Sequence, residues 1–323
     1  MTRTSSLAAS FLSLPVAAII ALVGAGGAHA APSASDEKSR PTVASAKADS
    51  TGAADYWTSD RMRAAVPGDV LASKALERGK PSSAANVLKG PNSTVKGTAA
   101  KATLAQPADP AAHIGKVFFT LGGANYVCSA NAVKSKNRST VATAGHCLNE
   151  GPGAFATNFV FVPQYQDGVA PYGAWTAEEY FTPTEWSVEG NIGYDTGFAV
   201  MAPREDKQLL EDVVGGSRVK FNQAYGLPYT SYGYPASKPF NGQRLWSCSG
   251  TTTTTDTTNP DFGTQGIPCD MTGGSSGGPW LTGTGTDVFQ NSVNSYGYGK
   301  SSVMYGPYWG EEIEEAYYRA AAA

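Results

Sequence analysis

The sequence is poor in charged residues and in histidine, and beyond residue 30 it has no long hydrophobic run. Charged residues make up 16% of the 323 positions, against 41% hydrophobic residues. The one sustained apolar run, from Phe11 to Val23, is shorter than the ~18 residues that a membrane span usually needs. No later segment approaches that length. We therefore expect no association of the mature chain with a membrane.

The first 30 residues have the pattern of an export signal. Arg3 supplies a positive start, Phe11 to Val23 is apolar, and Ala28-His29-Ala30 fits a small-x-small cleavage site. A membrane anchor is the alternative interpretation, against which the short apolar run argues. We expect residues 1–30 to be removed and the mature protein to be soluble, secreted and extracellular.

Cysteine is scarce, with four residues. They show no paired spacing typical of metal ligands, so we predict neither a metal site nor a cofactor. In an exported chain they are expected to form disulfides, for which three pairings exist. The sequential pairing of Cys128 with Cys147 and of Cys248 with Cys269 closes two short loops. Each such loop is worth about 3 kcal/mol in the chain-entropy model.

Residues 31–112, called the leader below, are rich in Ala, Ser, Lys and Pro. Only the stretch from Tyr56 to Leu76 carries scattered hydrophobic residues, so we predict a largely disordered linker or removable pro-segment. The leader has 11 Lys and Arg against 8 Asp and Glu, a net charge of +3. Residues 113–323, the body, have 12 against 19, a net charge of −7. This asymmetry favours a pro-segment that masks the body, and a plain spacer is the alternative.

The body reads as an all-β domain. Its predicted strands are short, β-branched or aromatic, and are separated by Gly, Pro, Asn and Asp, with no helical period between them. This pattern predicts antiparallel barrels, with one helix near the end of the chain, from Gly310. The strands are expected at 116–121, 126–133, 139–143, 159–162, 197–201, 219–222, 229–234, 243–248 and 288–295. The acidic body has no basic patch, which argues against nucleic-acid binding. The threonine run from Thr251 to Thr255, followed by Asp256, is expected to be an exposed loop.

Three segments of the body carry residues of nucleophilic catalysis. His146 follows a predicted strand within Ala-Gly-His-Cys, and of the three histidines it is the one in a folded segment. Asp195 lies at the start of an apolar strand, where a carboxylate needs a partner such as an imidazole N–H. Ser276 lies in the motif G-x-S-G-G-P, in which the N–H groups of Gly274 and Ser276 can form an oxyanion hole. A serine needs such a base and an orienting acid to act as a nucleophile.

The order His146, Asp195, Ser276 excludes other hydrolase classes. An α/β-hydrolase has its histidine after the serine, and no histidine follows Ser276. A subtilisin-like order requires an aspartate before the histidine, and the segment before His146 has no suitable acid. A cysteine nucleophile is disfavoured because the disulfides use all four cysteines.

These segments resemble the three catalytic blocks of trypsin-like (chymotrypsin-fold) serine peptidases, in particular the secreted bacterial branch related to glutamyl endopeptidases. The matching blocks are Thr143-Ala-Gly-His-Cys147, Tyr194-Asp-Thr-Gly-Phe-Ala199 and Gly274-Ser-Ser-Gly-Gly-Pro279. The resemblance covers roughly 113–323 and implies two six-stranded antiparallel β-barrels with a catalytic cleft between them. It also implies His146 as general base, Asp195 as its orienter and Ser276 as the acylated nucleophile.

The resemblance has departures that concern activation and specificity. Ser275 stands where animal members usually have the aspartate of their activation switch, so activation is expected to proceed by removal of the leader. Ser295, Tyr296 and Gly297 correspond to the strand that pairs with substrate. No histidine lies near that strand, which argues against a glutamate preference. Asp270 stands where trypsin-like enzymes bind Arg or Lys side chains, and a plain loop residue is the alternative.

The sequence therefore predicts a secreted serine endopeptidase that works through an acyl-enzyme. Its expected partners are protein or peptide substrates and its own pro-segment, and we expect a monomer. Two alternatives are a catalytically silent homologue that binds protein or cell-surface ligands, and an esterase. The presence of all three triad residues argues against the first, and the triad order on this fold argues against the second.

Overall fold

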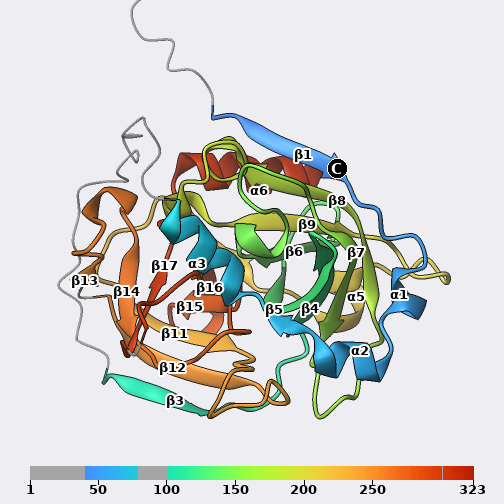
Figure 1. Ribbon diagram of the computed structural model, residues 1–323, viewed down its shortest axis with the longest axis horizontal. Coiled ribbons are helices and arrows are strands. Elements are labelled where there is room, and N and C mark those ends of the chain that lie inside the picture. The colour runs from blue at the N-terminus through green and yellow to red at the C-terminus, as the bar shows by residue number, and fades with distance from the viewer. Residues whose placement is uncertain (1–40, 79–100, 253, 300) are drawn as a thin grey trace, which may run out of the picture. The chain divides into compact units, whose positions relative to one another are not determined.

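The computed structural model describes residues 41–78, 101–252, 254–299 and 301–323 (Figure 1). The predicted signal at 1–30 lies outside this part of the chain. Most described residues of the body are in strands or in the loops that join them, as the sequence predicted. Among the helices described here, none has both the length and the apolar composition to cross a membrane.

The first half of the body is a closed six-stranded barrel. The strands follow the order β8–β7–β4–β5–β6–β9, and β8 also pairs with β9, which closes the ring. Every pairing in the ring is antiparallel. The strands are β4 (Ile114–Leu121), β5 (Ala124–Val133), β6 (Thr140–Thr143), β7 (Thr157–Pro163), β8 (Trp175–Pro183) and β9 (Gly197–Met201).

Successive side chains of β4 point to opposite faces of the sheet, and both faces are buried. Val117 and Phe119 belong to the main apolar core of the barrel. Phe118, between them, points to the other face and belongs to a second apolar cluster, which includes Trp57 of the leader. The turn to β5 has positive φ at Gly122 and Gly123, which suits a tight hairpin. The barrel wall is therefore covered from outside by the leader.

The second half of the body forms two sheets where the resemblance implied a second closed barrel. The larger has the order β10–β16–β15–β11–β12–β3, in which β3 (Thr103–Pro107) comes from the leader, and the smaller has the order β13–β14–β17. The elements are β10 (Arg218–Val219), β11 (Pro228–Gly233), β12 (Trp246–Thr251), β13 (Thr254–Thr255), β14 (Gln265–Pro268), β15 (Pro279–Thr282), β16 (Phe289–Val293) and β17 (Val303–Gly306).

The two sheets meet without a ladder where Gly250 of β12 lies against the ring of Pro268 in β14. Proline has no N–H to donate, so it cannot extend a ladder there. The Cys248–Cys269 disulfide joins the strands at this point instead.

The sequential disulfide pairing is confirmed. Cys128 is bonded to Cys147 and Cys248 to Cys269, at sequence separations of 19 and 21 residues. The predicted C-terminal helix is confirmed as α6 (Glu311–Ala322), which packs against β8 and β9. Its residues Ile313, Ala316 and Ala320 are buried in the barrel core. The shorter helices of the body are α4 (Thr184–Ser187), α5 (Leu210–Val214), η1 (Gly145–Cys147), η2 (Ile192–Tyr194), η3 (Pro260–Phe262) and η4 (Gly285–Asp287).

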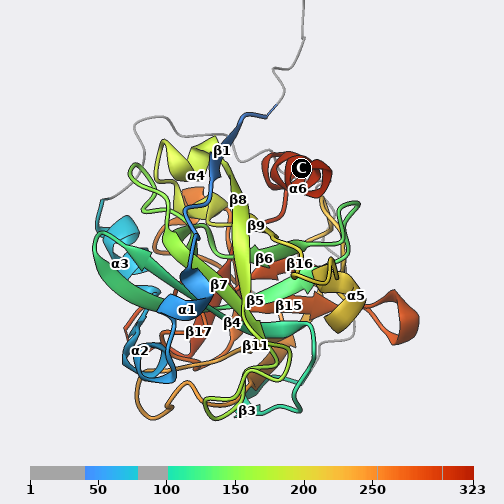
Figure 2. The same cartoon turned by 90° about the vertical axis from the view of Figure 1, so that its right-hand side faces the viewer.

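The described part of the leader consists of short elements attached to strands of the body. They are β1 (Val43–Lys47), α1 (Ala53–Tyr56), α2 (Ser59–Ala64), β2 (Val66–Pro67), α3 (Asp69–Glu77) and β3 (Thr103–Pro107). β1 pairs with β8, β2 with β5, and β3 with β12. Figure 2 shows β1 beside β8. These elements have no core of their own, because their buried residues pack on the body.

One buried cation stands out in the barrel wall. Lys116 in β4 is 2% exposed, and its Nζ donates to the Gly242 carbonyl at 2.9 Å. The Nζ also lies over the ring of Tyr165, 4.3 Å from its centroid. Burial lowers the pKa of Lys116 from 10.5 to about 7. Between these pH values the unfolded chain binds more protons than the folded chain, so the free energy of unfolding rises with pH there.

We expect Lys116→Met to stabilise the protein at pH 6 by ~1–3 kcal/mol, because methionine fills the site without a charge to desolvate. The substitution should also flatten the rise in stability between pH 7 and pH 10. Urea unfolding of the full chain at several pH values measures both effects. Lys136→Met, at an exposed position, is the control. An unchanged pH dependence in Lys116→Met would contradict the burial cost.

Candidate active site

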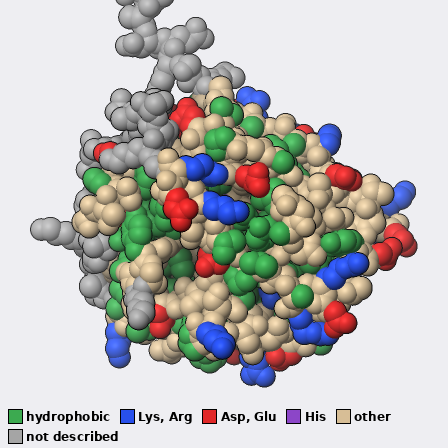
Figure 3. Space-filling model, viewed as in Figure 1, with side chains coloured by type: hydrophobic (Ala, Val, Ile, Leu, Met, Phe, Trp, Pro, Cys, Tyr) green, Lys and Arg blue, Asp and Glu red, His purple; other side chains and the backbone are tan. Residues whose placement is uncertain are grey.

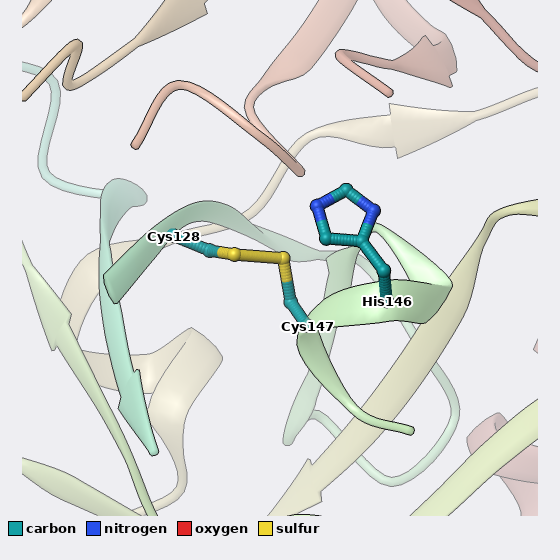
Figure 4. A group of neighbouring side chains, drawn as sticks. All are labelled: Cys128, His146 and Cys147. Atoms are coloured by element: carbon teal, nitrogen blue, oxygen red, sulfur yellow. A yellow bond between two sulfur atoms is a disulfide. The ribbon is translucent and has the colours of Figure 1, made fainter. Parts of the chain in front are cut away.

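His146 is positioned by a tight one-turn helix at the end of strand β6. The preceding residue must be small, because a Cβ on Gly145 would lie 2.6 Å from the indole of Trp186. The His146 side chain is fully buried, and its Nδ1 is 2.8 Å from Oδ2 of Asp195. Figure 4 shows the imidazole beside the Cys128–Cys147 disulfide, which pins the turn to strand β5.

Asp195 orients the imidazole from the residue after η2. The side chain of Asn191 accepts from the Gly193 N–H at 3.0 Å and so holds the start of this turn. The Asp195 carboxylate is fully buried and has three donors. Its Oδ1 accepts from the His146 backbone N–H at 2.7 Å, and its Oδ2 accepts from Nδ1 and, at 2.5 Å, from the Ser295 hydroxyl. These bonds fix both the ring and its tautomer.

The imidazole therefore presents Nε2 as an acceptor. When Nδ1 carries the proton that Asp195 accepts, Nε2 has a free lone pair. Nε2 is buried and has no hydrogen-bond partner in the part of the chain that the structure describes. A buried basic nitrogen without a partner is ready to accept a proton from a nearby group.

Ser276 lies on a sharp turn that packs against the strand leading to His146. Gly274 and Gly277 have φ values of 95° and 79°, which glycine adopts readily. A Cβ on Gly277 would lie 2.1 Å from Oγ1 of Thr143, so no other residue allows this approach. Ser276 is 4% exposed. The Ser276 Oγ makes no hydrogen bond to His146 Nε2 in the full chain.

The same turn has two N–H groups available for an anion. Within the described ranges, neither the Gly274 N–H nor the Ser276 N–H donates a hydrogen bond. The carbonyl of Gly274 faces away and accepts from the Ser129 hydroxyl at 2.8 Å. Successive N–H groups in such a turn can bind an oxyanion.

A pocket of about 370 Å³ opens beside Ser276. The predicted substrate-binding residues Ser295, Tyr296 and Gly297 line it, together with Ser275 and Ser276. Asp270 is also at this pocket, but it is exposed, and its Oδ1 accepts from the Ala105 N–H of β3 at 2.7 Å. In Figure 3 hydrophobic side chains gather around a hollow left of centre, and no histidine is visible on that face.

The leader forms one side of this pocket, and the sequence did not indicate which leader residues do so. Asp69, Ala72, Ser73 and Leu76 of α3 line the pocket, and α3 lies between the two halves of the body in Figure 1. Their spacing of three and four residues is that of one helix face.

Two leader residues reach the catalytic segments directly. The Gly68 N–H donates to the Val127 carbonyl at 2.9 Å, and a Cβ on Gly68 would lie 3.9 Å from the His146 ring. The Asp69 carboxylate contacts Gly273, where a Cβ would lie 2.0 Å from Oδ1. Burial raises the pKa of the Asp69 carboxyl, and His146 acts in the opposite direction. No motif in the sequence distinguishes Asp69 from other acidic residues of the leader.

Cys128, His146 and Cys147 have potential ligand atoms within 4.8 Å of one another. Both sulfurs are joined in the disulfide, so neither is available as a thiolate ligand. The cysteines here support the turn that carries His146.

Comparison with solved structures places the chain in a family. It matches the crystal structure of the protease Anisep from Arthrobacter nicotinovorans at 62% identity and a TM-score of 0.66, over 68% of this chain and all of that one. The chain is a chymotrypsin-fold serine protease. A thermostable serine protease, AL20, from an extremophilic microorganism matches at 50% identity and a TM-score of 0.63, over 66% of this chain and 98% of the other.

A Glu endopeptidase shares the fold of this serine protease at 20% identity and a TM-score of 0.54, covering 68% of this chain and 97% of that structure. No protein-family profile and no curated protein matches the sequence. The predicted family and its bacterial branch are confirmed by the solved structures.

We expect Ser295→Ala to lower kcat of this protease by about threefold to tenfold, because Asp195 loses one of its three donors and holds His146 less firmly. KM should change little, which steady-state kinetics on a peptide substrate will show. Ser292→Ala is the matched control, since the Ser292 hydroxyl is buried but donates to the Pro307 carbonyl. Equal kcat values for the two variants would contradict this role of Ser295.

Proposed function

We propose that this serine protease is a secreted endopeptidase in which Ser276 is the nucleophile, His146 the general base and Asp195 its orienting acid. The observation that carries the proposal is the buried His146–Asp195 pair, with Nε2 left as a free acceptor. The Ser276 turn packs on the strand that leads to that histidine. Two disulfides, and the signal-like pattern of residues 1–30, support export.

The first half of the reaction forms an acyl-enzyme. As Ser276 Oγ attacks the carbonyl carbon of the peptide bond, its proton moves to His146 Nε2. The carbonyl oxygen becomes an oxyanion, which the N–H groups of Gly274 and Ser276 stabilise. The C–N bond then breaks, and the imidazolium gives its proton to the departing amine.

The second half releases the product. Water enters where the amine left, gives a proton to Nε2 and attacks the ester carbon. The Ser276 Oγ–carbon bond breaks, and the proton on Nε2 returns to the serine oxygen. Asp195 keeps its negative charge throughout and stabilises the imidazolium each time it forms. A silent homologue would have the same fold and lack this chemistry.

A fluorophosphonate probe tests the nucleophile. We expect the active wild-type protein to be labelled at Ser276, and Ser276→Ala to lose both labelling and at least about 10⁴-fold of kcat/KM on peptides. Ser275→Ala is the matched control. In the described part of the chain the Ser275 hydroxyl donates to the Thr272 carbonyl alone, so this variant should still be labelled at Ser276. Mass spectrometry locates the label. A folded, uncovered wild-type protein that resists the probe would favour the silent homologue.

We propose in addition that the leader holds the enzyme inactive. Helix α3 forms one side of the pocket beside Ser276, and Ala72 and Ala75 of α3 share an apolar cluster with Tyr296 of the pocket. Gly68 and Asp69 lie against the disulfide beside His146 and against Gly273. A peptide substrate needs this same space, so the leader and a substrate exclude each other. Departure of β3 would also free Asp270 to meet a cationic side chain.

Substitutions in α3 test this block in the full chain. Ala75 is 2% exposed and lies within the apolar cluster that includes Tyr296, so Ala75→Arg cannot be accommodated there and should displace the helix. We expect the rate of fluorophosphonate labelling to rise by at least about tenfold. Val70→Arg places the same side chain on the outer face of α3, where Val70 is 39% exposed, and should leave the rate unchanged. Equal rates for the two variants would show that α3 does not block the site.

A further inference from the structure

A buried carboxylate lies behind the wall of the pocket. Asp256 is 1% exposed. The composition of the threonine run before it predicts an exposed loop, and for Asp256 this prediction is wrong. Within the described ranges no lysine or arginine forms an ion pair with it. A carboxylate that is buried without a cation requires several hydrogen-bond donors.

Both oxygens of Asp256 are fully used. Oδ1 accepts from the backbone N–H groups of Thr258 and Asn259, at 2.8 and 3.1 Å. Oδ2 accepts from the hydroxyls of Tyr296 and Tyr298, at 2.8 and 2.6 Å. One oxygen of the carboxylate therefore holds its own loop, and the other holds two tyrosines of the segment between β16 and β17, of which Tyr296 lines the pocket.

The two tyrosines are suited to donate to a carboxylate at neutral pH. Burial raises the pKa of Tyr296 well above its usual range, and burial with the bond to Asp256 raises that of Tyr298 to about 12. Each hydroxyl has a further partner, Thr264 Oγ1 at 2.8 Å for Tyr296 and Asn259 Nδ2 at 2.6 Å for Tyr298. Both side chains are thus fixed at the hydroxyl end.

Contacts between aromatic rings connect these two fixed tyrosines to the pocket. Tyr296 stacks on Tyr305 of β17 at 5.2 Å, and Tyr298 lies edge-on to both rings at 5.7 and 5.8 Å. The Tyr305 N–H also donates to the Tyr296 carbonyl at 2.8 Å. We call these three residues the tyrosine wall. Ser295, Tyr296 and Gly297 border the pocket next to Ser276, so this wall is its supporting layer.

We propose that Asp256 is a positioning residue, which fixes the tyrosine wall for binding apolar side chains of a peptide on one side of the bond to be cleaved. The proposal rests on the function proposed above. In the full chain the tyrosine wall already packs against small apolar side chains, because Ala72 and Ala75 of α3 belong to one apolar cluster with Tyr296 and Tyr305. When α3 leaves, the same apolar surface is open to a substrate with small or apolar side chains.

Replacement of Asp256 by asparagine tests this positioning role. Asp256→Asn keeps the shape but replaces one acceptor oxygen with an NH₂ donor, so it cannot accept from both tyrosines and both loop amides. For an extended apolar peptide amide we expect kcat/KM to fall by about tenfold, mainly through KM. In secreted protein that has lost the leader, the labelling rate with a small fluorophosphonate, which does not reach the wall, should stay within about twofold.

Two further variants complete the kinetic test. All variants are purified from the medium of a secreting host, and titration with the fluorophosphonate probe gives the concentration of active sites. Tyr298→Phe removes one donor at a partly exposed position and should raise KM by about threefold, which also serves if Asp256→Asn does not fold. Asp287→Asn changes an exposed carboxylate that pairs with Arg218 and Lys220, and should change neither KM nor labelling. An unchanged KM in a folded Asp256→Asn or Tyr298→Phe variant would overturn the proposal.

A readout without chemistry separates this inference from the proposed function. In a full-chain Ser276→Ala background, hydrogen exchange of the α3 amides reports how firmly the helix rests on the wall. Asp256→Asn should speed exchange in α3 by about tenfold while Asp287→Asn leaves it unchanged. If wild-type protein is never labelled but α3 exchange still responds to Asp256, the catalytic proposal fails and the positioning of the wall stands. If wild-type protein is labelled normally but Asp256→Asn changes neither the α3 exchange rate nor KM, the positioning role of Asp256 is wrong and the catalytic proposal stands.

Discussion

The hydrogen bonds of one buried carboxylate, Asp195, connect the parts of this protein that act together. Asp195 follows a short turn before β9 in the barrel, binds His146 at the end of β6, and accepts from Ser295 in the second half of the body. A buried charge without such donors would cost several kcal/mol. The two halves must therefore meet in one way for the carboxylate to be satisfied, and that same meeting brings the Ser276 turn against the strand that carries His146.

The sequence predicted the fold class and singled out His146, Asp195 and Ser276 as candidate catalytic residues, because both predictions depend on local patterns. The order of His146, Asp195 and Ser276 and the glycines around the serine are visible in the chain itself. Strand β8 is absent from the predicted strands because Glu178 and Glu179 give its centre the composition of a solvated segment. In the structure Glu178 is exposed while Tyr180 and Phe181 are buried, so polar residues on the outer face concealed a strand.

Asp69 and Asp256 could not be predicted, for a different reason. Each acquires its surroundings from segments far away in sequence. For Asp69 these are Gly273 and His146, and for Asp256 the segment with Tyr296 and Tyr298. A threonine run followed by an aspartate has the composition of an exposed turn. Only tertiary packing shows that this aspartate is the acceptor for two phenols. Buried polar networks of this kind make a surface specific, and composition does not reveal them.

Strand β3 shows that the leader also protects the sheet it joins. It pairs along β12, which otherwise has β11 as its neighbour in the larger sheet. Once the leader is gone, the N–H and C=O groups on that side of β12 face water, as in any edge strand. Edge strands recruit other extended chains, including copies of the same protein. Removal of the leader, as proposed above, would therefore expose an edge strand on the larger sheet, and the tendency of the protein to associate at high concentration would differ between the two forms.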